Sequence, residues 1–443
     1  MRLAALALLS AWLAMPVAAQ TVDALSRTEI NTFTASNANR QLTLCLLADM
    51  QNTVSQDDFD GIGGVTGCPV TAGYCTGASC TSSPYCSGSW HNTGRILMQN
   101  LAYELTGQWE KIDYSAIDGS DNVQSKKPHP LDNGHCDAIL SLGDMTDVPN
   151  DSGYGNYVAS SAATLTSLGY DYQHETNKAF WGIIDKSGIP YVLAQGNHDP
   201  WVWWADLFTT FAIEGKSYFY DREDVYGLSY AALIPTRLGT PLCVESLAFS
   251  DSYIDPNNPS QTTRGADVLA WAISNVGCGG DYPTVLIGHA EITIGGGLSF
   301  AADGVRIVDI TGIAGSPGAT GTSEVFMAAG GHYIGVEGMT PSVKTSFTGR
   351  FGADADQTVY TFFSNWQEVN RHDTNDAQLG ITASDGNGAA YTIVQIDANS
   401  SRICSHDWSP YWQTRNSRGN GQNHGEELMS SRCFDFDFDA RYP

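Results

Sequence analysis

Five short apolar segments of the sequence are each followed by side chains of the kinds that bind metal ions. Each segment has the length and composition of a buried β-strand; they are residues 42–48, 138–142, 191–194, 284–287 and 325–329. Helical patterns lie between them, over 89–105, 172–186 and 266–274, and this alternation indicates an α/β fold. The carboxyl ends of parallel strands meet at one edge of a sheet, where such folds bind ligands. We therefore expect side chains that are far apart in the chain to converge there.

The side chains at these strand ends are carboxylates, amides and imidazoles, without cysteine: Asp49 and Gln51; Asp144 and Asp147; Asn197, His198 and Asp199; His289; and His332. Such a set suits Mn, Fe or Zn ions. A single Gly-Asp-x-x-Asp turn has an ordinary explanation, in which the aspartate caps a helix. The four other strand ends favour a metal site instead. If Asp144 ends the central strand, its two carboxylate oxygens could bridge two ions about 3.5–4 Å apart, the spacing used in two-metal hydrolysis.

Taken in order, these residues resemble the motifs of the calcineurin-like metallophosphoesterase superfamily. The motifs are Asp49-x-Gln51, Gly143-Asp144-x-x-Asp147, Gly196-Asn197-His198-Asp199, Gly288-His289 and Gly331-His332, and the match spans residues 41–400. The resemblance implies an α/β/β/α sandwich with one or two divalent ions at the strand ends. It also implies hydrolysis of phosphomonoesters or phosphodiesters by a metal-activated water that bridges at Asp144.

The resemblance also implies a role for each site residue. Asp144 would bridge the ions. The first ion would be bound by Asp49 and Gln51, and the second by Asn197, His289 and His332. His198 would face the phosphate as a catalytic residue, and Asp199 would orient it, while Asp147 would support the loop.

Two departures from the family pattern both affect the first ion. Gln51 stands where the family usually has histidine, and Ile334 stands where the last motif usually has a second histidine. A replacement ligand could come from His91, His174 or His372. Two alternatives to the hydrolase remain: a one-ion relative that binds a phosphorylated or glycan ligand without hydrolysing it, and a structural exported protein that has lost the chemistry.

The ends of the chain and its cysteines indicate export. Residues 1–19 have one basic residue, a short apolar run and small residues at the end, which predicts a secretory signal peptide and a secreted or periplasmic protein without a membrane span. Ten cysteines in an exported chain favour disulfides. Cys68, Cys75, Cys80 and Cys86 lie in an insertion over 52–89, where their spacing argues against zinc.

Charge excludes one class of partner. The chain has 48 acidic and 22 basic residues, a formal charge of −26, which argues against nucleic acid as a partner. We expect a small phosphorylated substrate, and the sequence does not indicate an oligomeric state. Trp201, Trp203 and Trp204 could stack on a substrate or pack in the core.

The expected organisation is a signal peptide (1–19), one domain (41–400) and a C-terminal extension (401–443) that packs on the same domain. Phenylalanine and aspartate alternate over 434–439, which predicts a final half-buried strand next to Cys433.

Overall fold

The structure, a computed structural model, describes residues 40–48, 50, 93–112, 135–148, 150–151, 155–223, 227–248, 264–289, 324–332, 346–351, 358–364, 391–408 and 432–443. Several predictions concern positions outside these residues: the signal peptide, the insertion over 52–89, and the side chains Asp49, Gln51, His91, Ile334 and His372.

The first of two mixed sheets has six strands, and it contains three of the predicted strands side by side. β1 (Gln41–Leu47) runs parallel to β2 (Ala138–Ser141), and β2 runs parallel to β5 (Tyr191–Leu193). On the other side of β1 the sheet continues antiparallel through β13 (Tyr391–Asp397), β14 (Arg402–Trp408) and β15 (Arg432–Asp435).

The second sheet has seven strands in the order β11-β12-β10-β9-β8-β7-β6. Its centre is parallel, and is formed by β8 (Leu242–Leu247), β9 (Thr284–Gly288), β10 (Val325–Gly330) and β12 (Val359–Ser364). β6 (Phe219–Arg222), β7 (Tyr230–Ile234) and β11 (Ser346–Phe351) pair antiparallel at its sides. A separate ribbon joins β3 (Asn150–Asp151) and β4 (Gly155–Asn156).

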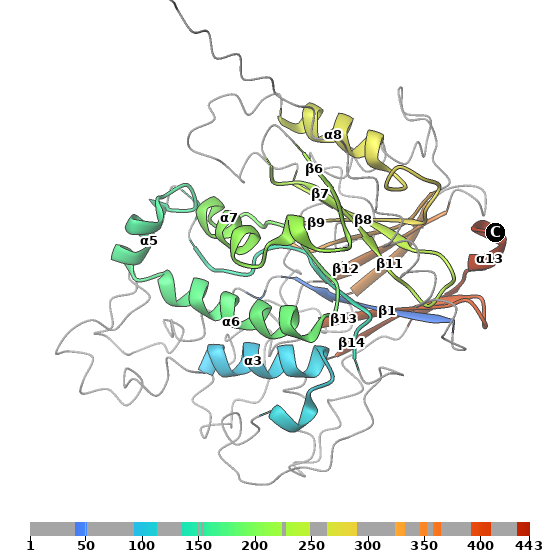
Figure 1. Ribbon diagram of the computed structural model, residues 1–443, viewed down its shortest axis with the longest axis horizontal. Coiled ribbons are helices and arrows are strands. Elements are labelled where there is room, and N and C mark those ends of the chain that lie inside the picture. The colour runs from blue at the N-terminus through green and yellow to red at the C-terminus, as the bar shows by residue number, and fades with distance from the viewer. Residues whose placement is uncertain are drawn as a thin grey trace, which may run out of the picture.

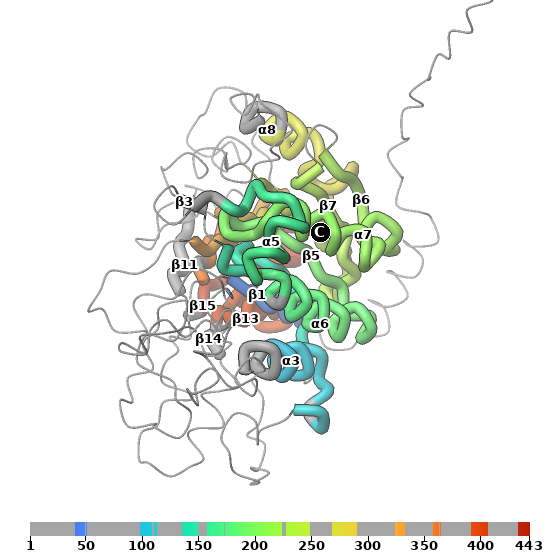
Figure 2. Tube along the Cα trace, turned by 90° about the vertical axis from the view of Figure 1, so that its left-hand side faces the viewer, coloured from blue at the N-terminus to red at the C-terminus, as the bar shows by residue number. Residues whose placement is uncertain are grey.

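Helices lie on both sides of the two sheets. Figure 1 shows α3 (Thr93–Leu105) and α6 (Asp171–Ser187) next to each other on one side and α8 (Arg264–Asn275) on the other, and Figure 2 keeps this order after a turn of 90°. α6 buries Phe180, Trp181 and Ile184 completely and ends at Gly188, whose left-handed conformation terminates the helix. In the part of the chain that the structure describes, the other helical segments are α5 (Ala162–Leu168), α7 (Trp201–Thr210), α13 (Phe438–Arg441) and the 3₁₀ turns η4 (Trp109–Lys111) and η5 (Ile213–Gly215).

Side chains of the second sheet cover the edge strand of the first. The amide of Leu193 on β5 donates to the hydroxyl of Tyr230 on β7 at 2.6 Å, and Ser246 on β8 donates to the carbonyl of Leu193 at 2.7 Å. The backbone groups of an edge strand would otherwise need water or another strand as partners. These bonds therefore fix how the two sheets meet, close to the strand ends that carry the site.

One hydrophobic cluster contains buried side chains from both sheets, such as Leu46, Val192, Val244 and Ile287. Three disulfides among the described residues add covalent links, as predicted for an exported chain. Cys45–Cys136 joins β1 to the residues before β2, Cys243–Cys278 joins β8 to the segment after α8, and Cys404–Cys433 joins β14 to β15.

The C-terminal tail differs from the prediction of one continuous strand. β15 ends at Asp435, and α13 begins after Asp437, whose carboxylate accepts a hydrogen bond from the amide of Ala440. This side-chain cap favours a helical turn over a further strand. Phe436 and Phe438 are still buried and stack around Phe326 of the second sheet.

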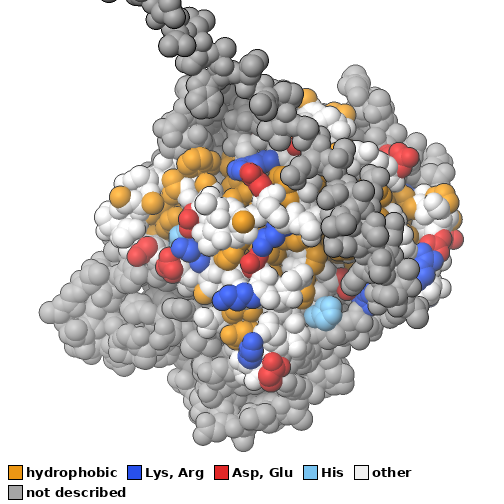
Figure 3. Space-filling model, in the orientation of Figure 1, with side chains coloured by type: hydrophobic (Ala, Val, Ile, Leu, Met, Phe, Trp, Pro, Cys, Tyr) orange, Lys and Arg blue, Asp and Glu red, His pale blue; other side chains and the backbone are white. Residues whose placement is uncertain are grey.

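The surface of the described residues shows no division into regions of one charge on the face drawn in Figure 3, where basic and acidic side chains lie beside one another. Among the helices that the structure describes, none combines the length and apolar character that a membrane crossing requires.

Candidate metal centre

Four strand ends from the two sheets meet at one place. Asp144 follows β2, Asn197 follows β5, His289 follows β9 and His332 follows β10. One ligand atom of each of Asp144, His289 and His332 lies within 4.8 Å of the others, so these three side chains could hold a metal ion. The first sheet supplies two of the four strand ends and the second sheet supplies the other two.

The Nε2 atom of His289 is the centre of this cluster. It lies 2.8 Å from Asn197 Oδ1, 3.0 Å from Asp144 Oδ2 and 3.1 Å from His332 Nδ1. Two ligands that are each about 2.1 Å from an ion, at right angles, are about 3.0 Å apart. The separations to His289 Nε2, which are also hydrogen-bond distances, therefore fit ligand atoms of one ion.

The hydrogen bond on the other side of the His289 ring sets its protonation. Nδ1 lies 2.8 Å from the carbonyl oxygen of Leu142, which can only accept, so Nδ1 carries the proton. In the neutral ring Nε2 then presents a lone pair, in the tautomer that metal ligands adopt. A positive group, either a proton on Nε2 or a metal ion, is needed where this lone pair meets the oxygens of Asn197 and Asp144.

Burial favours the neutral form of His332, the form in which an imidazole can bind a metal ion. Desolvation, together with the nearby His289 ring, lowers the pKa of His332 to about 4. Its imidazole is therefore neutral at neutral pH, as a metal ligand must be. Burial acts to raise the pKa of Asp144, but the His289 and His198 rings outweigh it, and the pKa of this carboxyl is lowered.

Glycines and unusual backbone angles bring the loops together. Asp144 and His332 have φ angles of 52° and 70°, in the left-handed region that non-glycine residues seldom adopt. A Cβ atom on Gly196 would collide with the amide nitrogen and Oδ1 of Asp144, and one on Gly143 would lie 2.7 Å from His289 Nδ1. Strained backbone of this kind concentrates at functional sites.

The structure places His198 beside the cluster, but next to a different acid from the one expected. The backbone amide of His198 donates to Asp144 Oδ1 at 2.7 Å, and its Nδ1 lies 3.5 Å from Asp147 Oδ1. Asp147, expected only to support the loop, is therefore the acid nearest to the His198 ring.

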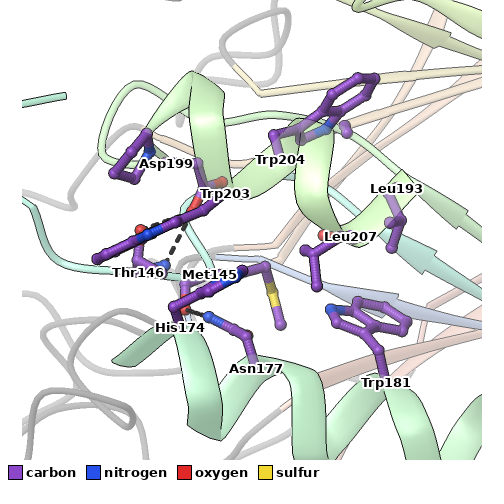
Figure 4. Close-up of a pocket in the computed structure, with 13 residues that line it drawn as sticks. Met145, Thr146, His174, Asn177, Trp181, Leu193, Asp199, Trp203, Trp204 and Leu207 are labelled. Atoms are coloured by element: carbon purple, nitrogen blue, oxygen red, sulfur yellow. Dashed lines mark hydrogen bonds between the residues drawn. The ribbon is translucent and has the colours of Figure 1, made fainter. Parts of the chain in front are cut away.

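Asp199 joins two loops instead of contacting the His198 ring. Its Oδ1 accepts from the amide and the hydroxyl of Thr146 at 2.9 and 3.0 Å (Figure 4). Its Oδ2 accepts from the amide of Gly196 at 2.9 Å. Burial and the Asp144 carboxylate raise the pKa of Asp199, while these donors oppose the rise. Asp199 thus fixes the position of the loop that carries Asp144 relative to the loop that carries Asn197.

Helix α6 contributes two residues that the sequence analysis missed. Gln173 accepts a hydrogen bond from the amide of Asp147 at 2.7 Å, and Asn177 donates to the carbonyl of Met145 at 2.7 Å. Both are buried amides, spaced one helical turn apart on the face that also buries Trp181. Polar side chains on an otherwise apolar helix face were the signal in the sequence.

Other candidate residues have structural surroundings. Nε2 of His174, considered as a replacement ligand, lies 2.7 Å from Asp206 Oδ2, and its ring stacks on Trp203. Trp203 and Trp204 are buried and pack in the core, which excludes them as an open stacking surface for a substrate. The predicted ligands of the first ion, Asp49 and Gln51, lie outside the residues that the structure describes.

No known protein-family model matches the sequence, and no curated protein is significantly similar to it.

Proposed function

We propose that this protein is an exported, metal-dependent hydrolase of phosphate esters, with the α/β/β/α sandwich architecture of the metallophosphoesterases. The observation that carries the proposal is the set of lone pairs at His289 Nε2. Three possible ligand atoms, Asn197 Oδ1, Asp144 Oδ2 and His332 Nδ1, lie within 3.1 Å of this nitrogen. A divalent ion can accept all of them at once.

The chain's own residues have distinct roles in this proposal. Asp144, Asn197, His289 and His332 would hold the ion, which when bound polarises a phosphate oxygen and lowers the pKa of water. His198 is 24% exposed and lies next to the ligand Asp144, so it can reach a phosphate and donate a proton to the leaving oxygen. Asp147 would keep the His198 ring oriented. Asn177, Gln173 and Asp199 would hold the loops in place.

The test combines metal analysis with turnover of p-nitrophenyl phosphate and bis-p-nitrophenyl phosphate. We expect bound Mn, Fe or Zn and hydrolysis of at least one of the two substrates. Asp144→Asn should lose both metal and turnover, whereas His198→Ala should keep the metal and lose about 100-fold or more in kcat. Asp281→Asn and His135→Ala, which change the same residue types away from the cluster, should behave as wild type.

The number of bound ions, together with turnover, distinguishes the hydrolase from a protein that only binds a phosphorylated ligand. The described residues supply the ligand set of one ion, so a protein that binds one equivalent and a phosphorylated ligand without turnover is the second candidate. One equivalent of metal and no hydrolysis with any added divalent ion would reject the hydrolase. Absence of bound metal in the purified and metal-supplemented protein would reject both.

A further inference from the structure

The Cys404–Cys433 disulfide is the most accessible of the three among the described residues. It joins directly opposite positions of β14 and the edge strand β15. Cys433 is exposed and Cys404 is half-buried, whereas the four cysteines of the other two bridges are at most 2% exposed. A thiol must reach a sulfur atom to attack it, so exposed disulfides are the ones that are reduced in folded proteins.

The residues that follow β15 cover part of the second sheet. Phe436 and Phe438 are buried, and the centroids of their rings lie 5.3 and 6.3 Å from that of Phe326 on β10. Phe326 is itself fully buried. Removal of these residues would therefore expose apolar surface of β10 to water.

Polar groups of the same segment bond to the backbone where β10 and β12 begin. Arg441 donates through Nη2 to the carbonyl of Val325 at 2.8 Å and through Nη1 to the carbonyl of Thr358. The hydroxyl of Tyr442 donates to the carbonyl of Glu324 at 2.8 Å. One short segment thus contacts the starts of two neighbouring parallel strands.

The segment is also bonded to the first sheet. The amide of Phe436 donates to the carbonyl of Ser401, between β13 and β14, at 2.8 Å, and Asp439 pairs with Arg40, which precedes β1. We call β15 and the residues after it, 432–443, the C-terminal clasp, because they contact both sheets. Figure 1 shows α13, the helical turn of the clasp, on the opposite side of the molecule from α5.

We propose that the C-terminal clasp is a redox-sensitive device, held closed by the Cys404–Cys433 disulfide and released by a dithiol reductant. β15 has only four residues, so strand pairing alone holds it weakly. While the bridge is intact, Cys433 cannot move away from Cys404. After reduction the two cysteines are joined only through the chain, 29 positions apart, and the clasp can open locally.

Release is a thiol–disulfide exchange. A thiolate of the dithiol attacks the exposed Cys433 sulfur, the disulfide bond breaks, and Cys404 leaves as a thiolate that takes up a proton. The second thiol of the reductant then attacks its own mixed disulfide and displaces Cys433. The dithiol has lost two electrons and two protons and has become a disulfide, and the two cysteines have gained both.

Opening of the clasp has a consequence for β10. It removes the rings that pack on Phe326 and the donors to the carbonyls of Glu324 and Val325. His332 follows the other end of this strand. The device would therefore couple the redox state of an exposed bridge to the strand that carries a candidate metal ligand.

The first test is reduction of the folded full chain with dithiothreitol, followed by alkylation with iodoacetamide and peptide mass spectrometry. We expect Cys404 and Cys433 to be alkylated before the cysteines of the two buried bridges. Earlier alkylation of either buried bridge would overturn the proposal. So would failure to alkylate Cys404 and Cys433 without denaturant.

Hydrogen exchange of the reduced protein measures whether the clasp opens. Amides of residues 436–442 and of β10 should exchange at least about tenfold faster after reduction, because local opening no longer requires the bridge to break. Amides of α6 serve as the internal reference and should be unchanged. Unchanged exchange over 436–442 would refute release of the clasp, and unchanged exchange in β10 would refute the coupling to that strand.

A pair of double variants provides the matched control. Cys404→Ser/Cys433→Ser lacks the bridge, so without reductant its clasp should exchange as in reduced wild type, and dithiothreitol should cause no further change there. Cys243→Ser/Cys278→Ser lacks a buried bridge instead, and its clasp should stay protected until reductant is added. Equal loss of protection in the two variants would show general destabilisation and contradict the proposal.

Discussion

Gly143 and Gly196 determine how closely the two central loops of the candidate metal site approach each other. A side chain on either residue would occupy the space of Asp144 or His289. Asp144 itself has a left-handed backbone, which is permitted because the hydrogen bond from the His198 amide and the contacts of its neighbours hold it. At the scale of single residues, the site therefore depends on small side chains as much as on ligands.

Gly196→Ala tests this dependence. The added Cβ would displace Asp144, so we expect a loss of about 2–4 kcal/mol in the free energy of unfolding and a drop of about tenfold or more in metal affinity. Gly182→Ala is the matched control, because a Cβ there meets nothing closer than Phe211 Cε1 at 3.8 Å within α6. It should stabilise the protein by about 0.5–1 kcal/mol. Denaturant titration measures the free energy of unfolding, and metal titration measures the metal affinity. Equal values for Gly196→Ala and Gly182→Ala would contradict the close approach of Gly196 to Asp144.

Glu245 gives a pH-dependent prediction at the same scale. Its carboxyl is fully buried on β8 without a hydrogen-bond partner among the described residues, and burial raises its pKa well above the usual value. Above pH 4.5 the unfolded chain releases this proton while the folded chain keeps it, so the folded protein loses stability as pH rises.

Glu245→Gln removes that titration. The free energy of unfolding of the variant, measured in urea, should therefore increase relative to that of wild type as the pH rises from 5 to 8. Glu175→Gln, which changes an exposed glutamate of α6, serves as the control and should show no such trend. A stability difference between wild type and Glu245→Gln that is independent of pH would show that Glu245 is ionised in the folded protein.

At the scale of elements, the strands that carry the candidate ligands are short, and covalent and side-chain links hold them in register. β2 and β5 have four and three residues. Cys45–Cys136 holds β1 next to β2, and the side chains of Tyr230 and Ser246 fix β5 against the second sheet. Strands of this length cannot be stable alone, so their partners determine where Asp144 and Asn197 lie.

The disulfides should differ in their contribution to stability. The Cys45–Cys136 bridge spans 91 residues and the Cys404–Cys433 bridge spans 29. The loop-closure model then predicts that the first stabilises the protein by about 1 kcal/mol more than the second. Burial of both Cys45 and Cys136 adds to the difference. Double alanine variants of each pair, compared by chemical denaturation, measure it, and the opposite ranking would contradict the prediction.

At the scale of the whole molecule, the charge of −26 acts against the compact state. Raising NaCl from about 0.05 M to about 0.5 M screens this repulsion, so we expect Tm at neutral pH to rise by several degrees. The effect should become smaller as the pH falls toward the range in which carboxylates are protonated. A Tm that is unchanged or lower in salt at neutral pH would show that local ion pairs outweigh the net charge.

The sequence by itself determined the five strands that carry the candidate site, the helices α3, α6 and α8, and the residue types at the strand ends. Apolar runs over β1, β2, β5, β9 and β10 and the helical pattern of α6 were recognisable because buried strands and amphipathic helices have local signatures. Contacts between distant segments have no local signature in the sequence, so only the tertiary structure decided which strands and side chains meet. It divided the strands that carry the candidate metal ligands between two sheets, and placed Asp147 and not Asp199 beside His198. These outcomes depend on which loops meet in space, and the chain specifies that through packing between distant segments.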